Sequence, residues 1–294
     1  MFESLASSVG VPALFVLIWS TGWVVVLYVT PHADPLTFLV VRFVLAGGLM
    51  ALIAWRFGAH LPRNPRYIAH AIGSGLFLHG FYLAGIWWAL GQGVPAGLSA
   101  LIAALQPLMT AVAAPFLLDE RLSGPRIFGI AIGFAGLVVA LSPKLVGLDP
   151  GHLWATLGPI LVNIVAMMSV TGGTFYQKAA LHGGDLRVTA ALQYLGALIV
   201  VLPLAYFLEP MRLTWTLETS LAMAWSVLGL SIGAISLLLL LIRRGDVSRA
   251  ATLIYLVPPT AALQAWLAKG VVMTPIQLAG MAITIFGVAL ASRR

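Results

Sequence analysis

Residues able to bind a solute are sparse in this 294-residue chain and lie inside long apolar runs. His79 and Tyr82 are three positions apart, so on a helix they share a face and present a ring nitrogen and a hydroxyl to one ligand. Lipid cannot satisfy such groups, so we expect them to face the protein interior or a cavity. We expect His79, Ser99 and Asn163 to hydrogen-bond the polar end of a small solute. Trp19 and Tyr82 would enclose its apolar part. The predicted binding residues are Trp19, Ser20, His79, Tyr82, Ser99, Asn163 and Tyr255.

Several of these side chains also have a structural interpretation. A lone histidine inside a helix is more often a satisfied core residue, and Asn163 could hold two helices together by hydrogen bonding. Trp19 and Tyr255 lie too deep for the aromatic belts of the membrane interfaces, so core packing and a cavity wall are equally open. Arg42 is about seven residues, or roughly 10 Å, inside its apolar run. We expect its side chain to extend outward to the interface in a structural role.

Prolines interrupt two apolar runs at corresponding depths. Pro107 lies in the first half of the chain, and Pro258 and Pro259 lie in the second. Paired interruptions free backbone groups that can bind the charged ends of a zwitterion, as transporters require. Gln106 could instead occupy the carbonyl that Pro107 frees.

Carboxylates are missing from the middle of every apolar run. All nine lie at the ends of runs or in loops, at Glu3, Asp34, Asp119, Glu120, Asp149, Asp185, Glu209, Glu218 and Asp246. A cation-selective antiporter needs a buried carboxylate for its drug or its proton, so this class is disfavoured. The chain has no cysteine, no HExxH motif and only dispersed histidines, so we expect no metal, no cofactor and no enzymatic activity.

Membrane-spanning helices must position these residues. Hydrophobic residues make up 61% of the chain and charged residues 9%, whereas soluble domains carry about 25% charged residues. Backbone groups in lipid must bond internally, so apolar runs of about 18 or more residues predict helices. We expect an all-α integral membrane protein with ten transmembrane helices, near residues 11–30, 35–56, 67–91, 95–118, 125–142, 152–177, 187–208, 218–242, 248–267 and 275–291.

Basic residues predict the orientation of these helices. With the N-terminus in the cytoplasm, the inner loops and the C-terminus hold twelve of the 16 Lys and Arg residues, and the outer loops hold three. This excess predicts that both termini are cytoplasmic. The net charge of +7 is therefore better explained by membrane topology than by nucleic-acid binding.

An internal repeat divides the chain into residues 1–148 and 149–294. Gly129 and Gly136 recur as Gly280 and Gly287, 151 residues later, and neighbouring positions recur at nearly the same offset. Each repeat would hold five helices, and five is odd, so the second repeat enters the membrane from the opposite side. Transporters use such inverted repeats for alternating access.

Four stretches resemble the EamA branch of the drug/metabolite transporter superfamily. They are WSTGWVVVLYVTPHADPLTFLVVRF (19–43), ALGQGVPAGLSALIAALQPLMTAVAAPFLLDERLS (89–123), GIAIGFAGLVVAL (129–141) and the second-half segments LVPPTAALQAW and GMAITIFGVALAS. The second half is the weaker match, since residues 270–274 stand where the first half has DERLS. The resemblance implies a metabolite exporter of the bacterial inner membrane, similar to amino-acid exporters of the YddG type.

The leading expectation is export of amino acids or similar small metabolites by alternating access through a central cavity. Without an Asp, Glu or Lys in the middle of a span, only His79 could carry a proton, so facilitated transport is expected and proton-coupled export through His79 is the alternative. An alternative from another class is a non-transporting membrane scaffold or assembly factor. The expected partners are a small solute and the lipid bilayer, with the chain acting as a monomer or a homodimer and binding no nucleic acid.

Overall fold

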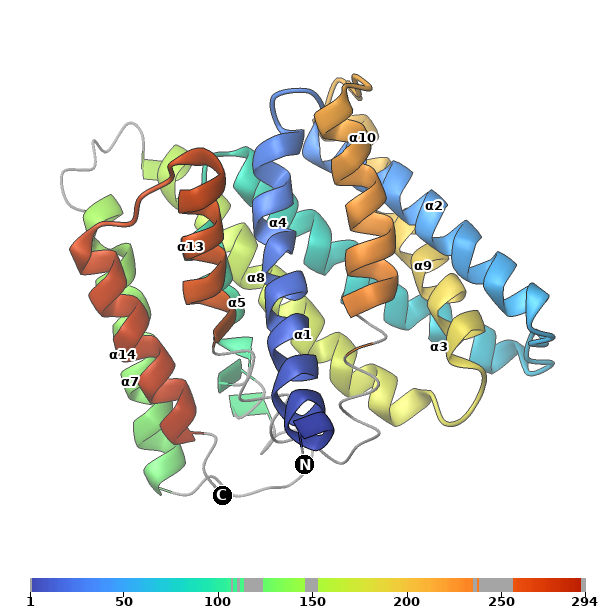
Figure 1. Ribbon diagram of the computed structural model, residues 1–294, viewed down its shortest axis with the longest axis horizontal. Helices are drawn as coiled ribbons and strands as arrows, with labels where there is room; N and C mark the ends of the chain where they lie inside the picture. The colour runs from blue at the N-terminus through green and yellow to red at the C-terminus, as the bar shows by residue number, and fades with distance from the viewer. Residues whose placement is uncertain are drawn as a thin grey trace. The chain divides into compact units, whose positions relative to one another are not determined.

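The chain folds into helices throughout the residues that the structure describes. The computed structural model describes residues 2–106, 108–109, 112–113, 124–145, 153–234, 237 and 256–291, and within them an isolated bridge between Ala33 and Leu213 is the extent of β-structure. The elements are α1 (Phe2–Val29), α2 (Pro35–Arg56), α3 (Pro65–Gly75), the π-helix η1 (Leu76–Phe81), α4 (Tyr82–Gly91), α5 (Ala96–Ala103), α7 (Gly124–Leu145), α8 (Leu153–Ala180), α9 (Leu186–Leu208), α10 (Leu217–Ala224), the π-helix η3 (Trp225–Ala234), α13 (Val257–Lys269) and α14 (Pro275–Ala291) (Figure 1). The all-α prediction is therefore confirmed.

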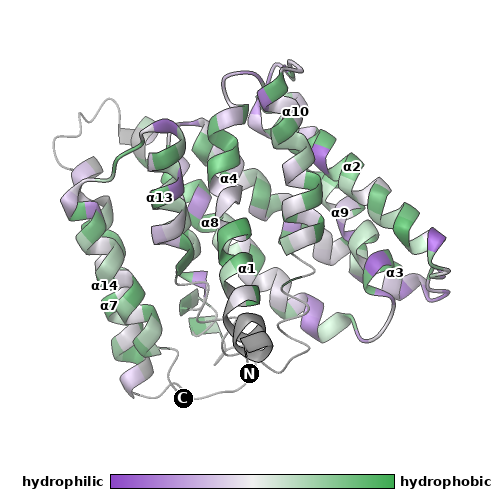
Figure 2. Cartoon of the chain, in the orientation of Figure 1, coloured by the Kyte–Doolittle hydropathy of each residue, from purple (hydrophilic) through white to green (hydrophobic). Residues whose placement is uncertain are grey.

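Several helices have the length and the surface of membrane spans. Four of them in the described part are long and apolar enough to cross a bilayer, at Pro35–Arg56, Leu157–Ala180, Leu186–Leu208 and Leu217–Ala234. Shorter apolar helices cover Ala13–Val29, Ile127–Ala140 and Pro275–Ala291. Hydrophobic residues predominate along these helices (Figure 2). Large apolar side chains such as Leu195, Ile199 and Leu202 on α9 are exposed at helical spacing. A lipid solvent explains this exposure; the count of ten spans stays a prediction.

The chain forms two compact units, and each unit takes segments from both halves of the sequence. The first unit comprises Met1–Leu27, Gly93–Ile164 and Gly233–Arg294, and the second comprises Tyr28–Gln92 and Val165–Ile232. Packing therefore joins segments that are distant in sequence. The predicted repeat boundary near residue 148 is a different division of the chain, and it stays a prediction.

In the first unit, α7 and α14 pack at backbone contact. A Cβ atom on Gly129 would collide with the backbone of Ala291, and one on Gly280 would collide with the backbone of Ala140. Thr284 Oγ1 also donates a hydrogen bond to Gly133 O at 3.3 Å. These contacts are reciprocal, because Gly280 and Ala291 lie 151 residues after Gly129 and Ala140. Small residues thus serve helix packing here, as they commonly do between membrane helices.

In the second unit, α9 is surrounded by α2, α3 and η1. The rings of Phe43 on α2 and Tyr194 on α9 stack with centroids 5.7 Å apart, and these residues are also separated by 151 positions. A Cβ atom on Gly75 would collide with the backbone of Gln193, and one on Gly196 with the carbonyl of Ile72. Glycines therefore allow α3 and α9 to approach closely at the level of Gln193 and Tyr194.

Candidate functional site

A polar cluster lies inside the second unit, and we call it the arginine cluster: Arg42, His79, Tyr82, Gln193, Tyr194 and Ser231. Arg42 on α2 donates hydrogen bonds from Nε and Nη2 to Ser231 Oγ on η3, at 3.3 and 3.2 Å. The Tyr194 hydroxyl donates to the Ser231 carbonyl at 3.4 Å, and the His79 ring stacks on the Tyr194 ring at 5.2 Å. Three α-helices and two π-helical turns thus bring polar side chains around one guanidinium.

Arg42 is buried and does not extend to the membrane interface as predicted. Its side chain is 6% exposed, and its guanidinium carbon lies 6.0 Å from the centre of the Trp87 ring. Trp87 is itself fixed by stacking on Phe38 at 5.2 Å. The outward prediction is wrong because an aromatic face and the Ser231 hydroxyl stabilise the guanidinium inside the unit.

The structure brings the predicted pair His79 and Tyr82 to this cluster. His79 lies in η1 and Tyr82 begins α4, and both side chains are only half-buried. Both interact electrostatically with Arg42. Gln193 lies beside His79 and donates hydrogen bonds at 3.0 Å to Ser74 and Gln177 in the same unit. Gln193 and Tyr194 are not among the predicted binding residues, although they lie 151 residues after Arg42 and Phe43, at the offset of the internal repeat.

The predicted residues of the first unit form a separate pair and two local contacts. Asn163 Nδ2 donates to Ser99 Oγ at 2.6 Å; both residues are fully buried, and Asn163 Oδ1 has no partner among the described residues. Ser20 is buried and donates to the Leu17 carbonyl at 3.1 Å, which favours a structural role. Trp19 is half-buried and packs against Phe15, with centroids 5.4 Å apart.

The predicted helix breaks are described only in part. Pro258 and Pro259 lie in the first turn of α13, where the missing N–H of a proline leaves no hydrogen bond unmade. Pro107 and Tyr255 lie outside the described residues. The proposed role of these breaks stays a prediction.

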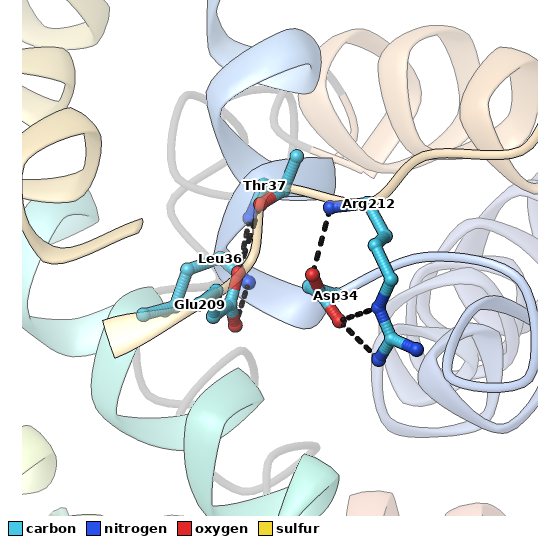
Figure 3. A network of polar contacts seen from close by, with 5 residues as sticks. All are labelled: Asp34, Leu36, Thr37, Glu209 and Arg212. Atoms are coloured by element: carbon cyan, nitrogen blue, oxygen red, sulfur yellow. Dashed lines mark hydrogen bonds and ion pairs between the residues drawn. The ribbon is translucent and has the colours of Figure 1, made fainter. Parts of the chain in front are cut away.

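A second polar network joins two loops at one end of the second unit (Figure 3). The Asp34 carboxylate accepts hydrogen bonds from the backbone N–H of Arg212 at 2.8 Å and from its Nε and Nη2 at 3.2 and 2.8 Å. The Glu209 carboxylate accepts from the N–H groups of Leu36 and Thr37 at 2.9 and 2.8 Å, so it caps the N-terminus of α2. We call these five residues the loop clasp.

Charge and burial act differently on the two carboxyl groups of the loop clasp. Burial by itself would raise the pKa of Asp34, but the hydrogen bonds and positive charge of Arg212 together lower that pKa below its usual value. Burial raises the pKa of Glu209 above its usual value, although its bonds to α2 oppose this change. The clasp borders a cavity of about 250 Å³ that is also lined by Trp88 and Gln92. Because its charged groups already bind one another and the helix terminus, we interpret the clasp as structural.

Metal chemistry has no evident site in the described part of the chain. Within it, no three His, Asp or Glu side chains are grouped so that they could hold an ion. The polar groups of the arginine cluster are a cation, hydroxyls, an amide and an imidazole, which suit the hydrogen bonding of a solute better than the coordination of a metal.

Comparisons with known proteins place the chain among transporters. The sequence profile of the EamA-like transporter family matches the chain twice, over residues 9–142 and 156–293. A probable amino-acid metabolite efflux pump of Salmonella typhimurium is 26% identical over 283 residues, which are 93% of this chain and 91% of that protein. YedA, an uncharacterised inner membrane transporter of Escherichia coli K12, is 30% identical over 287 residues, 95% of this chain and 89% of that protein.

The chain is also similar to an amino-acid exporter in sequence and to a solved structure in fold. The aromatic amino acid exporter YddG of Ancylobacter novellus is 28% identical over 178 residues, 58% of this chain and 59% of that protein. A solved structure described only as the crystal structure of a protein matches with a TM-score of 0.65 and 22% identity, over 97% of this chain and 96% of its own. At that identity, the second likeness concerns the fold alone.

Proposed function

Because the chain belongs to the EamA-like transporter family, within the drug/metabolite transporter superfamily, we propose that it exports amino acids or related small metabolites across the inner membrane. The family is one of transporters, so the chain is a membrane transporter and not an enzyme. The proposed mechanism is facilitated transport by alternating access, with ten membrane helices arranged as two inverted repeats of five.

The observation that carries the proposal is the arginine cluster. Its half-buried members His79 and Tyr82 offer hydrogen-bonding groups beside the buried charge of Arg42, in a segment that is otherwise apolar. Polar groups inside a membrane protein are costly, and their default interpretation is a functional site. Both π-helical turns of the unit contribute to the cluster, and such turns are frequent at functional sites.

Reciprocal helix contacts support the inverted repeat. Two segments related by a two-fold axis must exchange contacts: if residue a of one copy contacts residue b of the other, then b contacts a. The Gly129–Ala291 and Gly280–Ala140 contacts have this relation at the offset of 151 residues. The family profile also matches once in each half.

Solute flux in liposomes tests the proposal. Purified protein should catalyse counterflow of labelled phenylalanine, and a panel of amino acids and nucleosides should show competition by amino acids. His79→Ala and Tyr82→Ala should each lower flux roughly tenfold or more, since each loses a hydrogen bond to a solute in an apolar site. Trp215→Ala is the matched control, because Trp215 is 57% exposed outside the cluster, and its flux should be unchanged.

The results also separate the alternatives. A folded protein that moves no member of the panel would favour the scaffold interpretation. If an imposed pH gradient alone concentrates the solute, and His79→Gln abolishes this concentration while sparing exchange, transport is proton-coupled and the facilitated mechanism is wrong.

A further inference from the structure

Arg42 carries a positive charge into the interior of the second unit. Its hydrogen bonds from Nε and Nη2 converge on one hydroxyl, that of Ser231, and its guanidinium lies over the ring of Trp87. Ser231 Oγ in turn donates to the Ser226 carbonyl at 3.0 Å, so it is a neutral, fully engaged partner. These contacts solvate the guanidinium in part, but none of them supplies a negative charge.

No carboxylate among the described residues bonds to Arg42. Asp34 and Asp185 pair with other arginines, and Glu209 caps α2. In the sequence as a whole, every acidic residue lies at the end of an apolar run or in a loop. Burial of an unpaired charge is strongly unfavourable, so an arginine kept in this place calls for an anion that is present during function.

The form of the guanidinium and its surroundings favour a carboxylate as that anion. A guanidinium has five N–H donors in a planar fork, of which Ser231 takes two, and the fork matches the two oxygens of a carboxylate. Arg42 itself is 6% exposed, whereas His79 and Tyr82 are only half-buried and interact with its charge. These two residues therefore form the accessible side of the cluster.

We propose that Arg42 is the anchor for the carboxylate group of the transported solute, which binds from the side of His79 and Tyr82. The inference rests on the proposed transport function and narrows its substrate class to solutes with a free carboxylate. The charge of Arg42 acts strongly over several ångströms in a medium of low dielectric constant. It therefore selects against cationic solutes whether the solute contacts the guanidinium directly or binds a few ångströms away. Amines that lack a carboxylate are rejected.

Competition in the liposome counterflow assay tests this selection. Labelled phenylalanine is the reporter, and the competitors are 3-phenylpropionate, which has only the carboxylate, and 2-phenylethylamine, which has only the ammonium group. The wild-type protein should be inhibited by 3-phenylpropionate at a concentration at least about tenfold lower than by 2-phenylethylamine, as a charge-assisted hydrogen bond requires. In Arg42→Gln this ratio should fall to about one, and Arg42→Lys, which keeps the charge but loses the planar fork, should have a ratio between one and that of the wild type.

Controls separate failure of the inference from failure of the transport function. Arg63→Gln removes an exposed arginine from a loop of the same unit and should leave the ratio unchanged. If the wild type moves phenylalanine but its ratio is near one, or Arg42→Gln keeps the wild-type ratio, the anchor is wrong while the transport function stands. If the wild type moves no member of the panel, both the proposed transport function and the Arg42 anchor are wrong. If Arg42→Gln does not fold, the wild-type ratio and that of Arg42→Lys decide, and a ratio near one in either overturns the proposal.

Discussion

At the scale of single residues, Asp34 shows how one carboxylate can hold two loops together. Its side chain is 8% exposed and accepts three hydrogen bonds from Arg212, which lies 178 residues later in the sequence. The backbone N–H of Asp34 also donates to the Arg212 carbonyl at 2.9 Å. Asp34 is also the N-cap residue of α2, but its side chain makes no capping hydrogen bond there, so its loss loosens the loop pairing and leaves the Glu209 cap of the helix in place.

The lowered pKa of Asp34 predicts a pH dependence of stability. Its pKa lies below the ordinary value of 3.8 in the folded protein, so the unfolded chain takes up the proton first as the pH falls. The contribution is therefore complete above about pH 5 and lost progressively below about pH 4. Asp34→Asn should lower stability by about 1 kcal/mol at pH 7, since Arg212 is 74% exposed and solvent screens the pair.

Thermal melting in detergent between about pH 7 and pH 3 measures this effect. The difference in melting temperature between wild type and Asp34→Asn should shrink as the pH falls, and contributions from carboxyl groups that do not interact with Asp34 cancel in that difference. A difference that stays constant, or grows toward low pH, would contradict the assigned role of the Arg212 contact. The contribution of Glu209 to stability changes with pH in the opposite direction: its pKa is raised in the folded protein, so protonation at low pH favours the folded form.

Residue spacing predicted the part of the candidate site that is local in sequence. His79 and Tyr82 are three positions apart, and the structure places both on the arginine cluster. The partners of Arg42 were not predictable in this way, because Tyr194 and Ser231 are 152 and 189 residues away and reach it only through helix packing. Hydropathy also misplaced Arg42, since it does not reveal an aromatic face such as Trp87 inside the unit.

At the scale of helices, the π-helical turns recur with the repeat. The turn η1 covers Leu76–Phe81, and a shift of 151 residues places it at 227–232, inside η3 at Trp225–Ala234. A π-turn inserts one residue into the helical ladder and re-aims the side chains that follow. Apolar periodicity predicted single continuous helices in both segments, because one inserted residue leaves the apolar composition of a run unchanged.

Replacing glycine by alanine should have opposite effects on stability in the close contact between α7 and α14 and at an open position in α2. Gly280→Ala puts a Cβ atom against the backbone of Ala140, which must shift, so we expect a loss of about 1–3 kcal/mol. Gly48→Ala is the matched control in α2, where nothing lies within 4 Å of the added atom. There, alanine should stabilise the helix by about 0.5–1 kcal/mol. Melting of the two variants in detergent checks this, and equal effects would contradict the close packing.

At the scale of the whole molecule, the second unit has two ends that differ in charge. At one end, the Tyr67 hydroxyl donates to the Gly183 carbonyl at 3.0 Å, so the first turn of α3 meets the loop before α9. At the other end, the loop clasp joins the loops before α2 and after α9. The first end holds five basic residues, Arg56, Arg63, Arg66, Lys178 and Arg187, and the second end holds Arg212. The segments that meet at each end of the unit are thus ones that the sequence predicts to lie on the same side of the membrane.

This pairing allows the predicted orientation to be tested with single cysteines, because the chain has none of its own. The basic end should be cytoplasmic, since short loops rich in Lys and Arg remain inside. Cysteines at the exposed positions Asn64 and His182 should react with a membrane-impermeant maleimide only in inside-out vesicles. A cysteine at the exposed Thr214, at the opposite end, should react only in intact cells or right-side-out vesicles. Labelling of Asn64 and His182 from opposite sides would contradict the fold of the second unit, whereas labelling of both from outside would reverse the orientation and leave the fold intact.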